Sequence, residues 1–62
     1  MTLAWVVGRM HVGTSDAEVR AEIRRRLRPE VPTRERQRIV DAAVRIHRRN
    51  RRLYVAVMGG RL

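Results

Sequence analysis

The 62-residue chain contains no cysteine and no lysine. Without cysteine, neither disulfides nor thiolate-bound zinc can stabilise so short a fold, and nothing indicates an oxidising compartment. Phenylalanine is absent too, and there is one tryptophan and one tyrosine, too few for the aromatic platforms on which single-stranded nucleic acids stack. The N-terminal apolar run, residues 3–7, is too short for a signal peptide or a membrane span. We therefore expect a cytoplasmic protein that does not act at a membrane.

Motifs for catalysis and cofactor binding are also missing. The chain has no glycine-rich phosphate loop, no nucleophile elbow and no HExxH pair, and Gly8 and Gly13 do not form a dinucleotide fingerprint. Two histidines without cysteine make no case for a metal site. The sequence predicts no enzyme, no cofactor, no metal and no small-molecule substrate.

What the chain has in abundance is arginine. All fifteen basic residues are arginine, and the net charge is +9. Residues 1–33 carry six arginines against four acids, whereas residues 34–62 carry nine against two. Codon usage in a GC-rich genome explains arginine in place of lysine, but not the excess of cations over acids. Such an asymmetry indicates an anionic partner.

Residues 2–12 favour a β-strand, because Trp5, Val6, Val7 and Val12 are β-branched or aromatic. A lone strand leaves its backbone groups unpaired, so it needs an edge to pair with. A chain of this length also buries only about 60% of the surface of its unfolded form, which makes an isolated monomer marginal. The edge could come from another copy or from elsewhere in this chain, and the short chain favours another copy, so we expect a homodimer.

A first helix is predicted over residues 15–28. Ser15 and Glu18 have the spacing of a capping box at its start, and Pro29 ends it. The spacing also predicts two i,i+4 ion pairs inside it, Asp16 with Arg20 and Glu22 with Arg26. Residues 29–32, with a proline at each end, form a stiff corner between helices.

A long second helix is predicted over residues 33–58, with Thr33 as its N-cap and Gly59-Gly60 at its end. At the helical period, one arc of about 140° is mainly apolar and the opposite side is basic. The residues of the apolar arc are Ile39, Val40, Ala43, Ile46, His47, Asn50, Leu53, Tyr54, Val57 and Met58. The alternative ends the helix near Asn50 and makes residues 53–58 a strand.

The basic side of this helix is the main candidate site. Its members are Arg34, Arg38, Arg45, Arg48, Arg49 and Arg52. Guanidinium groups bind phosphate oxygens through a rigid fork of donors, so this surface suits a nucleic-acid backbone or an acidic protein. The competing interpretation is a solvated outer face in an arginine-rich protein, but only Asp41 interrupts the six like charges, which favours binding. His47, Asn50 and Tyr54 could form a small polar site, although satisfied polar groups at the rim of the core are the more common outcome.

The order strand, helix, helix resembles the ribbon-helix-helix architecture, in which two copies pair their strands and place them in the major groove of DNA. This resemblance implies that Arg9 and His11 are ribbon contacts and that the helix start at Thr33 lies near a phosphate. The exposed face of such a ribbon would carry Leu3, Trp5 and Val7, which suits burial better than base reading.

A second resemblance covers most of the chain. The opening run from Trp5 to Asp16, the run from Ile23 to Arg26, and the later pattern of His47, Asn50, Leu53, Tyr54, Val57 and Met58 resemble small uncharacterised proteins of actinobacteriophages. The resemblance implies a context inside a bacterial host, with no known activity, fold or site residues.

Together, these observations predict a mostly α-helical fold with one N-terminal β-strand, in a single small domain. The predicted function is that of a non-enzymatic phage accessory protein that binds nucleic acid through its arginines. The alternative is an effector that binds and modulates a host protein, with the basic surface docked on acidic residues.

Overall fold

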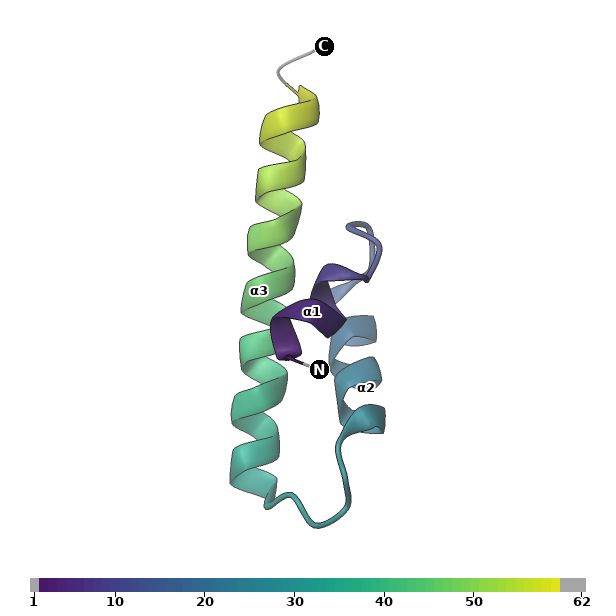
Figure 1. Cartoon of the computed structure of the whole chain (residues 1–62), viewed down its shortest axis with the longest axis vertical. Coiled ribbons are helices and arrows are strands. Elements are labelled where there is room, and N and C mark those ends of the chain that lie inside the picture. The colour runs from purple at the N-terminus through teal and green to yellow at the C-terminus, as the bar shows by residue number, and fades with distance from the viewer. Residues whose placement is uncertain (1, 60–62) are drawn as a thin grey trace.

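The computed structural model describes residues 2–59 of the chain. This part consists of three helices, α1 (Leu3–Gly8), α2 (Asp16–Arg26) and α3 (Thr33–Gly59). Helix α2 runs antiparallel beside the first half of α3, and α1 crosses in front of both (Figure 1). The second half of α3 extends well beyond the other two helices, which makes the molecule a rod of 47 × 20 × 14 Å.

The predicted N-terminal strand over residues 2–12 is wrong, because residues 3–8 form α1. Thr2 caps this helix by accepting a hydrogen bond from the Trp5 amide, at 3.2 Å. Val7 is buried against the other helices, and Val6 and Met10 pack on the same core. Residues 2–59 offer no strand edge, so a helix, which satisfies its own backbone groups, is the stable choice.

Helix α2 begins at Asp16, one residue after the predicted start, and ends at Arg26, two residues before the predicted end. The Glu18 amide donates to the Ser15 hydroxyl oxygen at 3.2 Å, so Ser15 is the N-cap. The Ser15 hydroxyl in turn donates to the Glu18 carboxylate, instead of the carboxylate reaching the Ser15 amide as in a full capping box. Leu27 has extended backbone angles, which ends the helix before residue 28.

The long final helix is confirmed, and the strand alternative for residues 53–58 is wrong. Thr33 is the first helical residue and not the N-cap, because the Arg36 amide donates to the Pro32 carbonyl at 2.8 Å. Gly59 is still helical, and Gly60 lies outside the described residues. A helix of this length spans about 40 Å at 1.5 Å per residue.

The core lies where the three helices meet and is small. Its buried apolar residues are Val7, Val19, Ile23, Val40, Ala43 and Val44. None is aromatic and none is larger than isoleucine, so the apolar area removed from water is modest even for a chain of this length.

Ion pairs link α2 to α3 on one side of the core. Arg20 contacts Asp41 at 2.8 Å, and Arg48 contacts Asp16 through two hydrogen bonds of 2.5 and 3.0 Å. The predicted pair between Asp16 and Arg20 is therefore replaced by two contacts between helices. The predicted pair between Glu22 and Arg26 is present at 2.9 Å.

Candidate nucleic-acid interface

Five arginines of α3 form a continuous basic surface that we call the arginine face: Arg34, Arg38, Arg45, Arg49 and Arg52. All five are exposed. At 3.6 residues per turn they occupy an arc of about 60°, whereas the buried residues of α3 are centred on the opposite side of the helix. From Arg34 to Arg52 the face extends about 27 Å along the helix axis. The packing of α1 and α2 thus holds α3 with its basic side towards solvent.

The arginine face forms no ion pair within the described part of the chain, although the charge of Arg45 helps to lower the pKa of the nearby Asp41. None of its members lies within 4.0 Å of a carboxylate there. The sixth arginine predicted for this surface, Arg48, is exposed as well but is paired with Asp16. The structure therefore keeps five of the six predicted arginines available for an external anion and assigns the sixth to the contact between helices.

Two shallow hollows lie between these side chains. One, of about 620 Å³, is lined by Arg34, Arg38 and Arg45, by Glu35, Ile39 and Ala42 of the same helix, and by Leu3 and Pro32. The other, of about 500 Å³, is lined by Arg45, Arg48, Arg51 and Arg52. Both are open to solvent and lie one after the other along α3, which suits an extended polyanion better than an enclosed small molecule.

Two further arginines of α3 have structural roles that the sequence analysis missed. Arg51 donates to the carbonyl oxygens of Val12 and Thr14, at 3.2 and 3.1 Å, and so holds the loop between α1 and α2. The Arg36 Nη2 lies 3.2–3.4 Å from three carbonyl oxygens of the corner, those of Arg28, Pro29 and Val31. At the helical period, both arginines lie on the buried side of α3. This spacing is the sequence signal that distinguishes them from the members of the arginine face.

The carboxylates that pair between the helices have lowered pKa values. Hydrogen bonds from Arg48, and the positive charges of Arg48 and Arg51, hold the pKa of Asp16 below 3.8, although partial burial acts in the opposite direction. The hydrogen bond from Arg20 does the same for the pKa of Asp41. Pairing with Asp16 raises the pKa of Arg48. These residues are charged at neutral pH and serve the fold.

His47 is buried, with 1% of its surface exposed. Its Nε2 donates to the His11 carbonyl oxygen at 3.0 Å, and its Nδ1 lies 3.4 Å from the Arg51 guanidinium. Asn50 is half-buried and Tyr54 is exposed. The three residues do not share a site, and His47 is a hydrogen-bonded core residue.

Arg9 and His11 follow α1 and belong to no ribbon. The Arg9 guanidinium lies over the Trp5 ring, 4.7 Å from its centre, and the His11 Nδ1 accepts from the Gly13 amide at 2.9 Å. These are local contacts that shape the start of the loop. A ribbon-helix-helix architecture needs a strand at this point, and the described residues have a helix there.

Two other kinds of site are absent from the described residues. No group of three or more histidine, aspartate or glutamate side chains lies close enough together to hold a metal ion. None of the three helices combines the length and apolar character needed to cross a membrane.

Comparison of the chain with protein-family models, with curated proteins and with solved structures gives no match. The resemblance to actinobacteriophage proteins therefore stays a prediction.

Proposed function

We propose that the protein binds the phosphate backbone of duplex nucleic acid through the arginine face, with little dependence on base sequence. The observation that carries this proposal is that five exposed arginines on one side of a rigid helix have no carboxylate partner in the described residues. Like charges held this close repel one another, and an external polyanion would relieve the repulsion. A phosphate chain supplies that charge and releases bound counterions as it binds.

The dimensions of the face fit a duplex. Its length of about 27 Å corresponds to roughly eight base pairs at 3.4 Å per pair. Every member of the face is an arginine, and guanidinium groups bind phosphate oxygens and can also read guanine in the major groove. The side chains best suited to reading adenine lie elsewhere, because Gln37 donates to Asp41 and Asn50 is on the opposite side of α3.

The aromatic residues also favour duplex over single strands. Trp5 is on α1 with Arg9 stacked on its ring, and Tyr54 leaves α3 on the side opposite the arginine face. The arginine face itself therefore carries no aromatic side chain on which a base could stack.

Fluorescence anisotropy with a labelled 20-base-pair duplex tests the proposal. If each arginine of the face contacts one phosphate, the affinity should fall about 500-fold between 50 and 200 mM salt, and should vary little with sequence. An affinity that does not change with salt contradicts the proposal. In a parallel pulldown from nuclease-treated bacterial lysate, a stoichiometric acidic protein would support the alternative of a protein partner.

A further inference from the structure

The last two turns of α3 carry apolar side chains on every side and stand clear of α1 and α2 (Figure 1). We call residues 53–58 the α3 tip. Its large side chains, Leu53, Tyr54, Val55, Val57 and Met58, are between 46% and 61% exposed. At 100° per residue they point around the whole circumference of the helix. A helix that is apolar all round is normally surrounded by other apolar groups.

The α3 tip lies beyond the core of the molecule. The sequence places four of its residues in the same helical arc as the core residues, but the last buried residue of α3 is His47. From Arg52 to Gly59 every residue of α3 is exposed. The part of the chain that the structure describes therefore leaves the tip uncovered, and the apolar surface of the tip does not stabilise the fold.

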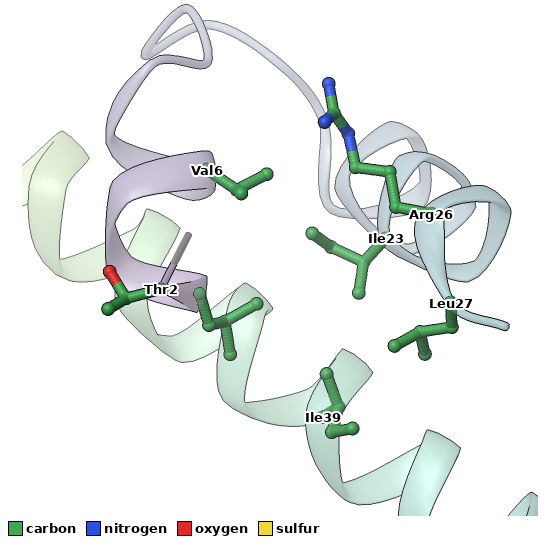
Figure 2. A pocket seen from close by; sticks show the side chains of 7 residues that line it. Thr2, Val6, Ile23, Arg26, Leu27 and Ile39 are labelled. Carbon is green, nitrogen blue, oxygen red and sulfur yellow. The ribbon is translucent and has the colours of Figure 1, made fainter. Parts of the chain in front are cut away.

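A second apolar surface of the molecule, a groove of about 280 Å³, is of a different kind. Its lining comes from α1, from α2 and the residue just after it, and from α3. Figure 2 shows the side chains of Val6, Ile23, Leu27 and Ile39 turned towards one common space. Such a groove accepts a single side chain, whereas the α3 tip exposes apolar groups on all sides at once.

The residues around the α3 tip carry positive charge only. After Asp41 the sequence contains no acidic residue, whereas residues 42–62 contain six arginines. Arg52 comes directly before the tip and Arg49 about one turn before it, and both are exposed members of the arginine face. An apolar helix end next to unpaired arginines matches the surface of an anionic bilayer, where phosphate groups lie above the acyl chains.

We propose that the α3 tip inserts into the surface of an anionic lipid bilayer, with Arg49 and Arg52 on the lipid phosphate groups. A protein groove covers one side of a helix and leaves the opposite side in water, whereas a fluid lipid layer surrounds the tip. The tip is about 9 Å long, close to the depth of about 5–10 Å at which interfacial helices bury apolar groups. Tyr54 suits this boundary, because its ring is apolar and its hydroxyl is polar.

The insertion is shallow. The last carbonyl groups of a helix have no partner within the helix, and in the centre of a bilayer they would also lose their water. At the headgroup boundary water still reaches them, so the tip stays there. The expectation that the chain does not act at a membrane rests on the lack of a long apolar run, and a shallow helix end needs no such run.

The proposal does not depend on nucleic-acid binding. Arg34 and Arg38 lie about 28 and 22 Å from the start of the tip along α3, so they stay away from the lipid when the rod stands upright on it. Arg49 and Arg52 serve both surfaces. Duplex nucleic acid should therefore compete in part with the bilayer for the same chain.

Flotation with lipid vesicles tests the proposal. The wild-type chain should float with vesicles made of equal parts phosphatidylcholine and phosphatidylglycerol. It should bind vesicles of phosphatidylcholine alone about 20-fold more weakly, because each of the two arginines contributes about 5-fold near an anionic surface. A chain that does not bind the mixed vesicles contradicts the proposal, and another protein is then the partner that covers the α3 tip.

The double variant Leu53→Ala and Val57→Ala keeps the net charge of +9 and the helix propensity of the tip. Its affinity for the mixed vesicles should fall on the order of 30-fold, because the side chains, 54% and 61% exposed, lose the groups that enter the lipid. The matched control is Trp5→Ala, which removes an equally exposed apolar side chain from α1 and should leave vesicle binding unchanged. Circular dichroism checks that each variant keeps its helices.

Tryptophan fluorescence locates the inserted segment. The emission of Trp5 in the wild type should not change when the mixed vesicles are added. The tryptophan introduced by Met58→Trp, in a chain that also carries Trp5→Phe, should shift to shorter wavelength and be quenched by brominated acyl chains. Equal vesicle binding by the wild type and the double tip variant, or a shift at position 5 and none at position 58, overturns the proposal.

Duplex binding separates this proposal from the proposed function. The double tip variant should bind duplex with the affinity of the wild type, because it keeps every member of the arginine face. A chain that binds the mixed vesicles through its tip and does not bind duplex contradicts the proposed function alone. A chain that binds duplex and not the vesicles contradicts the lipid contact alone.

Discussion

Replacing Arg45 and Arg52 with glutamine removes two of the five unpaired charges of the arginine face. Both residues are exposed, and neither is within 4.0 Å of a carboxylate in the described part of the chain, so the fold should be little affected. Each phosphate contact contributes about 0.9 to the slope of log affinity against log salt, which corresponds to about 8-fold in affinity at 100 mM salt. The double variant should bind a duplex about 60-fold more weakly, with a slope near −2.7 in place of about −4.5.

The matched control removes the same charge from α2 and the residues just after it. Arg24 and Arg28 are exposed and have no carboxylate within 4.0 Å in residues 2–59, and replacing both with glutamine also lowers the net charge from +9 to +7. Anisotropy titrations at several salt concentrations compare the two double variants directly. If the control loses as much affinity as the α3 variant, binding depends on net charge alone and the assignment to the arginine face is refuted.

Two other predictions concern the fold. Replacing His47 with alanine removes a buried ring and its hydrogen bond to the His11 carbonyl, and should cost about 2–3 kcal/mol in urea unfolding, whereas His11→Ala, which keeps that carbonyl, should cost much less. The pKa values of Asp16 and Asp41 are lowered in the folded state, so their contribution to stability is present above the ordinary value of 3.8 and is lost as the pH falls through the folded values. Urea unfolding at a series of pH values should show this loss, and it should shrink in the double variant Asp16→Asn and Asp41→Asn.

The predicted N-terminal strand is wrong because the strand preference of single residues is a weaker signal here than their helical spacing. Val6 and Val7 are β-branched and favour strands, but strand preference depends strongly on the surroundings of the residue. Leu3, Val6, Val7 and Met10 also follow the i, i+3, i+4, i+7 spacing of a helix face, and the structure places Val7 in the core with the other three packed around it. The periodic signal was the more informative one, since no partner strand exists in the described residues.

The long helix and its basic side could be predicted because both depend on local periodicity. The ion-pair partner of each charged residue could not be predicted from the sequence. Asp16 and Arg20 have a favourable i,i+4 spacing, yet each pairs with a residue of α3 more than twenty positions away. Spacing describes only neighbours on one helix, and it carries no information on which other helix will approach. For the same reason, the sequence places Arg48 with the other arginines of the basic side, although the structure pairs it with Asp16.

The absence of lysine has two explanations that apply to different arginines. On the arginine face, a lysine ammonium would also contact phosphate, so lysine could replace arginine there. Codon usage is therefore a sufficient reason for arginine on this face. At Arg36 and Arg51 one guanidinium contacts several backbone carbonyl oxygens at once, on the corner and on the loop between α1 and α2. Lysine lacks the planar fork that spans such acceptors. At Arg51 two different nitrogens, Nε and Nη2, donate to two carbonyl oxygens, so the fold favours arginine there whatever the genome's composition. At Arg36 all three contacts come from Nη2 alone, and a lysine ammonium, with three donors on one nitrogen, could also make them.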